Sequence, residues 1–230
     1  MKSVRKRGAK KSNRASHGLR ETKQIQFWKG DFAKGYIERN VLTLQQLNER
    51  MRLYFKDKET FSGMIKTSLQ DIPKDSSILE VGCNVGNILE VFRSLGFTNL
   101  QGIELNPEVV KIANKLRPHL KITTGSILDI QAPDRVYDVV FTAGVLIHIA
   151  PENIHQALSE VVRVSRKYIW GYEYWSPEYE EIPYRGNRNV LWKADFPKLY
   201  GTIAALRTKY VRKLPLKEKG KSDVIYLLEK

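Results

Sequence analysis

Apolar residues in this chain follow two kinds of pattern: short continuous runs, and stretches with a spacing of three or four positions. The runs predict buried strands, because a parallel strand that is covered on both faces is apolar on both. These strands are predicted at 77–81, 100–104, 121–123, 137–142 and 168–174. The helical spacing predicts helices at 87–95, 107–117 and 151–164. This alternation indicates an α/β fold with a parallel sheet and right-handed crossovers.

The segments on either side of the alternation differ from it. Between 22 and 70, apolar residues recur at helical spacing and predict at least two helices, which would cap the ligand cleft of a domain at 71–230. Near the C-terminus, 203–211 and 223–228 predict two further strands around a charged turn. Residues 1–21 have no apolar pattern and are predicted to be a disordered basic tail.

Charge changes the picture at the two ends of the chain. Residues 1–20 contain eight Lys and Arg residues and no acid, out of a net charge of +14. Such a tail can touch RNA, DNA or an anionic membrane surface, or can be solvated without a partner, since it has no aromatic residue to stack on bases. A second basic stretch between Arg207 and Lys221 is expected at the last hairpin, where a solvated sheet edge is the alternative interpretation.

Composition limits the cellular compartments and the cysteine chemistry open to this chain. The hydrophobic content of 42% is enough for a core, and no apolar stretch of membrane-spanning length is present. The basic N-terminus is not followed by an apolar segment, which argues against secretion and favours the cytoplasm. Cys83 is the single cysteine, so no internal disulfide is possible, and it has no nearby base to make it a nucleophile. We expect a small turn residue there, and no metal site.

The end of the first predicted strand has a polar turn. The segment reads Ile78-Leu79-Glu80-Val81-Gly82-Cys83-Asn84-Val85-Gly86-Asn87, so an acid and a glycine turn follow the strand and a helix is predicted to start near Val85. Glycines allow close approach of a ligand to the backbone, and a helix start offers unpaired N–H groups. Glu104, at the end of the second strand, is placed to accept hydrogen bonds from two ribose hydroxyls. This layout is typical of a nucleotide-type ligand, and the structural alternative is a strand–glycine–helix unit that merely packs.

The turn discriminates between nucleotide ligands. The dinucleotide fingerprint requires glycine where this chain has Asn84, and glycine or alanine at the position of Asn87. A P-loop requires a Gly-Lys-Ser/Thr sequence that does not follow the turn. Glu80 would repel a pyrophosphate and favour a ligand with positive charge. S-adenosylmethionine carries an ammonium and a sulfonium.

These residues resemble the first motif of the class I S-adenosylmethionine-dependent methyltransferases, Glu/Asp-x-Gly-x-Gly-x-Gly. Glu80, Gly82 and Gly86 match it, while Asn84 replaces the middle glycine and belongs to the residue types that tolerate positive φ. The resemblance implies a Rossmann-like, seven-stranded, mostly parallel sheet with an antiparallel last strand. It also implies S-adenosylmethionine as cofactor. The loop after the third strand would hold the adenine, and this chain has Ser126 where many relatives have Asp. The cofactor-binding residues implied are Glu80, Gly82, Asn84, Gly86, Glu104, Leu105, Ser126, Ile127 and Thr142.

A narrower resemblance covers roughly 26–200. The segments 26–40, 144–149 and 184–186, together with the Gly-x-Asn-x-Gly loop, look like the methyltransferases associated with pseudaminic acid biosynthesis. This resemblance implies a sugar-derived acceptor, a nonulosonic acid or its nucleotide-activated form. His148 in this pattern is a candidate general base, or else a structural histidine.

Aromatic residues cluster after position 167. Tyr168, Trp170, Tyr172 and Tyr174 alternate and are expected on one face of a strand, with Tyr168 and Trp170 in the core. Rings bind sugars and bases by stacking, and arginine forks suit a carboxylate or phosphate. The predicted substrate-binding residues are Tyr172, Tyr174, Tyr184, Arg185 and Arg188.

Two function classes compete. The first is a methyltransferase acting on an O or N atom of a small molecule. The second is an RNA or DNA methyltransferase that uses the basic termini to bind nucleic acid. The fourth strand is not followed by Asp/Asn-Pro-Pro-Tyr/Phe or by a cysteine, which argues against base amino and cytosine C5 methylation but leaves ribose and cap methylation open. A third reading is a binding protein with a degenerate cofactor site. The acceptor atom and the oligomeric state are left open by the sequence.

Overall fold

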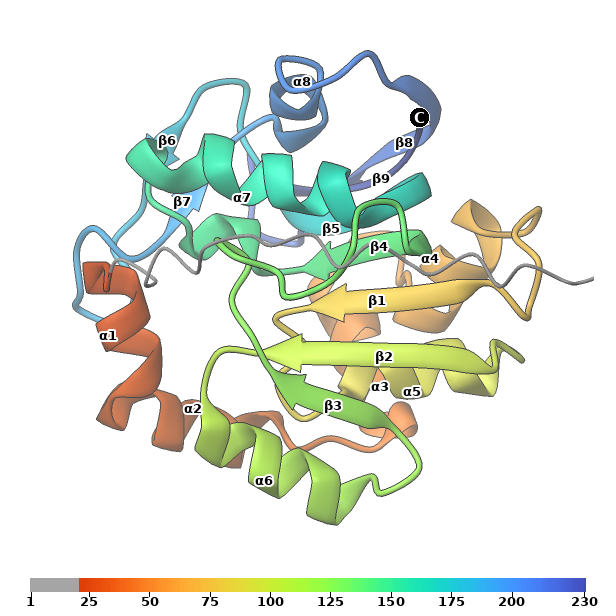
Figure 1. The fold of residues 1–230 in the computed structure, drawn as a ribbon. Helices are drawn as coiled ribbons and strands as arrows, with labels where there is room; N and C mark the ends of the chain where they lie inside the picture. The colour runs from red at the N-terminus through yellow and green to blue at the C-terminus, as the bar shows by residue number, and fades with distance from the viewer. Residues whose placement is uncertain (1–20) are drawn as a thin grey trace, which may run out of the picture.

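The sheet has seven strands in the order β3-β2-β1-β4-β5-β9-β8 (Figure 1). This computed structural model describes residues 21–230, apart from the side chains of residues 31–34 and 38. The strands are β1 Ser77–Val81, β2 Asn99–Glu104, β3 Lys121–Thr124, β4 Tyr137–Ala143, β5 Ser165–Trp175, β8 Arg207–Pro215 and β9 Ser222–Glu229. The first five are parallel, and β9 is antiparallel to both β5 and β8. The predicted Rossmann-like, mostly parallel sheet with an antiparallel last strand is confirmed.

Helices cover both faces of the sheet because strand residues alternate between two hydrophobic clusters. In β1, Ile78 packs in one cluster and Leu79 in the other. The first cluster is covered by α3 Leu44–Tyr54, α4 Phe61–Ser68, α5 Asn87–Ser94 and α6 Pro107–Leu116. The second is covered by α7 Pro151–Val164 and α8 Phe196–Tyr200. The fully buried Trp170 lies in the first cluster, as expected for the core.

Two further helices lie at the carboxyl ends of β1–β3. They are α1 Lys23–Lys29 and α2 Asp31–Asn40, and Figure 1 shows them beside the tips of these strands. Two side-chain amides hydrogen-bond these helices to the rest of the domain. Asn87 Nδ2 donates to the Asn40 carbonyl at 2.6 Å, and Asn106 Nδ2 donates to the Trp28 carbonyl at 3.2 Å. We call α1 and α2 the cap.

The last strands differ from their predicted bounds. The predicted 203–211 strand begins only at Arg207, because residues just after α8 continue as a helical turn in which Ile203 N donates to the Tyr200 carbonyl. The hairpin pairing of Pro215 with Ser222 then carries β8 on to Pro215. A two-stranded sheet of β6 Glu180–Glu181 and β7 Trp192–Lys193, and the short 3-10 helix η1 Leu146–His148, were not predicted.

The basic residues of the C-terminal stretch lie mainly on the β8 edge, where several already have partners. Arg207 pairs with Glu229, and Arg212 pairs with Asp57 and with Glu59 at 2.7 Å. These ion pairs reduce the free positive charge of the edge. Residues 1–20 of the predicted tail lie outside the described residues. Among the described residues, no helix is long and apolar enough to cross a bilayer.

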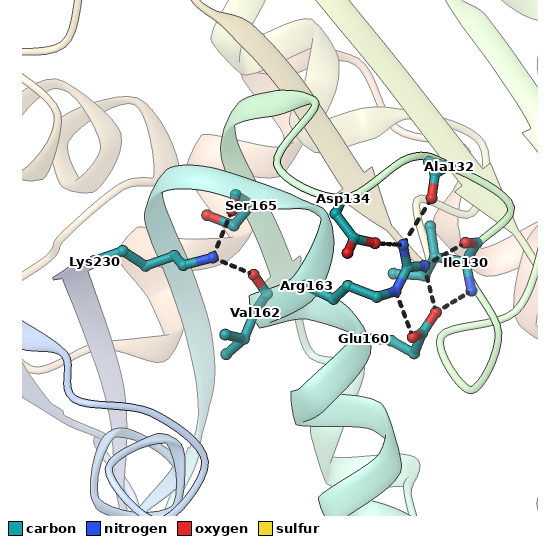
Figure 2. Close-up of polar contacts among 8 residues, drawn as sticks. All are labelled: Ile130, Ala132, Asp134, Glu160, Val162, Arg163, Ser165 and Lys230. Carbon is teal, nitrogen blue, oxygen red and sulfur yellow. Dashed lines mark hydrogen bonds and ion pairs between the residues drawn. The ribbon is translucent and has the colours of Figure 1, made fainter. Parts of the chain in front are cut away.

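Arg163, a partly buried residue of α7, binds the β3–β4 connection (Figure 2). Arg163 donates to both carboxylate oxygens of Glu160 at 2.7 Å and to the carbonyls of Ile130 and Ala132 at 2.7 and 2.8 Å. It also pairs with Asp134 at 2.8 Å. Next to this cluster, Lys230 Nζ donates to two carbonyls at the end of α7 (Figure 2).

Arg163→Ala is expected to lower the free energy of unfolding by about 2–3 kcal/mol, because the Glu160 carboxylate loses its guanidinium partner and two loop carbonyls lose the same donor. Urea unfolding followed by circular dichroism measures this loss. The matched control is Lys111→Ala, which breaks an ion pair whose side chains are 72% and 68% exposed, with an expected loss below about 1 kcal/mol. Equal losses in the two variants would contradict the structural role of Arg163.

Candidate functional site

A cavity of about 400 Å³ opens at the carboxyl ends of the parallel strands. Its walls come from the turn after β1, the ends of β2 and β4, the loop after β3, the cap and α3. Predicted cofactor residues in its lining are Glu80, Gly82, Asn84, Glu104, Leu105, Ser126 and Ile127. They are brought together because the carboxyl ends of neighbouring parallel strands meet at one edge of the sheet.

The turn after β1 contains three left-handed residues. Gly82, Asn84 and Gly86 have φ values of 75°, 49° and 79°. Asn84 therefore adopts the positive φ that glycine usually has at this position, and its Oδ1 accepts from Val85 N at 2.6 Å. A Cβ on Gly82 would lie 2.7 Å from a methyl of Val145, so the turn and the loop after β4 are packed against each other.

Two acids lie at this end of the cavity, Glu80 buried and Glu104 partly buried. Glu80 is 3% exposed, and its Oε2 has no hydrogen-bond partner among the described residues. Burial, reinforced by the charge of Glu104, raises the pKa of Glu80 well above its usual range. Burial also raises the pKa of Glu104, against the opposing effect of backbone N–H groups from Asn106 at 3.0 Å and Asn84 at 2.9 Å. An unpaired buried acid is costly, so this end of the cavity favours a cationic ligand.

Two predicted cofactor residues lie outside the lining. Gly86 caps α5, and a Cβ there would lie 2.9 Å from Ile122, so this glycine serves helix–strand packing. Thr142 is buried and its hydroxyl faces Glu173. Cys83 is buried as well: burial raises the pKa of its thiol well above the usual range, and its sulfur packs against Gly102. This agrees with its expected role as a small turn residue.

The other end of the cavity is aromatic. We call the aromatic chamber the part lined by Trp28, Tyr36, Tyr54, Tyr174 and Tyr184. The Trp28 and Tyr36 ring centroids lie 5.2 Å apart, edge to face. Burial raises the pKa of Tyr36 to about 12, and burial likewise raises the pKa of Tyr54 and Tyr174, so these hydroxyls stay protonated.

His148 lies in the wall of this chamber. Its ring centroid is 4.5 Å from that of Trp28 and 5.8 Å from that of Tyr184. Nδ1 lies 2.8 Å from the Val190 carbonyl, which can only accept, so Nδ1 carries the proton. Burial lowers the pKa of His148 to about 4. The imidazole is therefore neutral, with Nε2 as its basic nitrogen.

The predicted substrate residues divide into two groups. Tyr172, Tyr174 and Tyr184 line the cavity, with the Tyr172 hydroxyl bonded to Asp223. Arg185 and Arg188 are exposed and lie outside the lining. Arg185 belongs to the 184–187 turn, in which Arg185 and Gly186 have positive φ. Within the described part of the chain, Arg50 is the one cationic side chain in the lining.

Sequence reasoning missed three rings of the chamber. Trp28 and Tyr36 come from the cap and Tyr54 from α3, far in the chain from the glycine turn. Trp28 and Tyr36 lie within the 26–40 segment that carried the narrower resemblance, whereas Tyr54 was one apolar position in a helical pattern. Membership of the 26–40 segment was therefore the one sequence signal that could have predicted Trp28 and Tyr36 as site residues.

Known proteins resemble the chain in domain and fold. The family model described as "Methyltransferase domain" matches residues 79–168. The chain is 14% identical to a solved 1,6-didemethyltoxoflavin-N1-methyltransferase from Burkholderia thailandensis, with 96% of this chain and 93% of that one covered and a TM-score of 0.66. For a magnesium protoporphyrin IX methyltransferase from Synechocystis, the identity is 10%, the coverage 93% and 99%, and the TM-score 0.65. No curated protein sequence matches the chain.

Proposed function

We infer that the chain is a class I S-adenosylmethionine-dependent methyltransferase that methylates an O or N atom of a small organic molecule. The matched domain and the fold support the class. One observation carries this proposal: a single cavity joins two acids at one end, one buried and one partly buried, to an aromatic chamber with a neutral histidine at the other. The first end suits a cationic nucleoside, and the second suits an acceptor.

The residues of the acidic end fit S-adenosylmethionine. In this proposal Glu104 accepts from the ribose hydroxyls, and Glu80 compensates positive charge through its Oε2, which has no partner among the described residues. Leu105, Ser126 and Ile127 line the adjoining wall and would hold the adenine. When bound, the cofactor supplies an electrophilic methyl group.

His148 is proposed as the group that takes the proton released by the acceptor. Its Nδ1–H is fixed by the Val190 carbonyl, so Nε2 keeps its lone pair in one defined orientation. The rings of the chamber exclude water and align the acceptor, which supplies much of the catalysis of such a transfer.

The chamber favours an uncharged acceptor, because five aromatic rings form it and Arg50 is the one cation in the described lining. A nonulosonic acid or its nucleotide-activated form is a second candidate. It is supported by the exposed Arg185, whose guanidinium lies 5.9 Å from the ring of Tyr184, a residue of the chamber.

The proposal is tested by incubating the purified chain with S-adenosylmethionine and a metabolite extract. Mass spectrometry should find a product heavier by one methylene group, together with S-adenosylhomocysteine. Parallel reactions with N-acetylneuraminic acid and with total RNA separate the acceptor classes. Methylation of RNA alone would contradict the small-molecule proposal.

Deleting residues 1–20 is expected to leave methylation of a small acceptor within about twofold, because a small acceptor has no polyphosphate backbone for the eight cations to bind. A nucleic-acid enzyme would instead lose affinity and salt sensitivity with its eight cations. Initial rates at low and high salt, compared between the full chain and the deletion variant, measure the difference.

A further inference from the structure

Glu173, a buried acid on β5, lies beneath the loop that follows β4. Its side chain is fully buried. Val145 N and Leu146 N each donate to Oε1 at 3.2 Å, and Ile147 N donates to Oε2 at 3.4 Å. One carboxyl group therefore satisfies three successive backbone N–H groups that would otherwise be buried without an acceptor.

The 144–149 loop contacts both ends of the cavity. Val145 packs on the turn after β1, where its methyl groups lie 2.7 and 3.0 Å from the Cβ position of Gly82. His148 follows three residues later and contacts Trp28 of the chamber. Because Val145 and His148 are anchored on the same short loop, a shift of its backbone displaces both.

Among the described residues, no cationic side chain pairs with Glu173. The groups that face it are uncharged: the Thr142 hydroxyl on β4, and the phenols of Tyr179, Tyr200 on α8 and Tyr226 on β9. Burial raises the pKa of Glu173 to about 7, although its hydrogen bonds oppose this rise. The folded state favours the protonated form, so the stability contributed here falls as the pH rises from 4.5 towards 7.

We propose that Glu173 is a positioning residue, whose carboxylate fixes the 144–149 loop and thereby sets Val145 against the cofactor turn and His148 against the acceptor. The part that concerns cofactor and acceptor rests on the proposed function. The part that concerns the loop is independent of it.

The test compares Glu173→Gln with Asp223→Asn in the full chain. Asp223 is a matched control because it is equally buried, has a pKa raised by burial to about 7, and bonds Tyr172 instead of the loop. Both substitutions remove a buried carboxyl, so both should flatten the pH dependence of the unfolding temperature. Glutamine can offer the loop one oxygen only, and its amide hydrogens face the loop N–H groups.

Two measurements decide the proposal. By hydrogen-exchange mass spectrometry, the amides of 145–147 should exchange about tenfold faster in Glu173→Gln, the effect of one lost hydrogen bond, and at the unchanged rate in Asp223→Asn. By calorimetry above neutral pH, Glu173→Gln should weaken S-adenosylhomocysteine binding about tenfold, while Asp223→Asn stays within about twofold.

The outcomes are separable. Unchanged exchange in Glu173→Gln overturns the proposal whether or not the cofactor binds. Faster exchange with unchanged S-adenosylhomocysteine affinity also overturns it, since the loop would then not be coupled to the cofactor turn. If the unsubstituted chain fails to bind S-adenosylhomocysteine while exchange still rises in the variant, the proposed function falls and the positioning of the loop stands.

Discussion

Glu104→Ala is expected to weaken S-adenosylhomocysteine binding by about a hundredfold, because two ribose hydroxyls would lose a charged acceptor worth about 1.5–3 kcal/mol per hydrogen bond. The substitution also removes the acceptor for Asn84 N and Asn106 N, so the turn after β1 loses one of its hydrogen bonds to β2 and keeps those to the Ile103 carbonyl. Isothermal titration calorimetry on the full chain measures the dissociation constant.

The matched control for Glu104 is Glu108→Ala, which removes an acid in the first turn of α6 with a side chain that is 68% exposed. The S-adenosylhomocysteine affinity of this variant should stay within about twofold of that of the unsubstituted chain, because solvent and salt screen the charge of an exposed side chain. An affinity for Glu104→Ala equal to that of this control would show that the ribose assignment is wrong.

His148→Ala is expected to lower kcat by about a hundredfold to a thousandfold, with a smaller change in KM, if the acceptor loses its proton to this imidazole. The control is His119→Ala, whose exposed imidazole pairs with Glu90 away from the cavity. Full turnover in His148→Ala, measured by S-adenosylhomocysteine release, would remove this histidine from catalysis and favour alignment by the chamber alone.

The same substitution has a consequence for stability. The folded pKa of His148 is lowered from 6.5 to about 4, so the folded state favours the neutral ring. Stability contributed here is present above pH 6.5 and falls as the pH drops from 6.5 towards 4. In His148→Ala this part of the pH dependence should be absent from thermal unfolding curves.

The strand pattern predicted the sheet and one end of the cavity because both depend on local sequence. A continuous apolar run such as 77–81 defines a buried strand, and Glu80, Gly82 and Glu104 are positioned by the ends of two neighbouring strands. The positive φ of Asn84 could likewise be anticipated from the residue type.

The other end of the cavity depends on how separate elements pack, which spacing does not encode. Tyr54 reaches the chamber because α3 is packed near α5, while Arg185 turns outward because of the backbone of a short turn. Thr142 was predicted to face the cofactor from its position at the end of a strand. Its hydroxyl faces Glu173 instead, and Ala143 lines the cavity.

The two hydrogen bonds between the domain and the cap have a consequence for how related enzymes diverge. Asn87 and Asn106 bind the cap through main-chain carbonyls, which every amino acid provides. Side chains of the cap can therefore be exchanged without loss of these two attachments. Because Trp28 and Tyr36 come from the cap, such exchanges would reshape the chamber while the acidic end, built from β1 and β2, keeps its geometry. Acceptor preference can thus drift over evolutionary time independently of cofactor use.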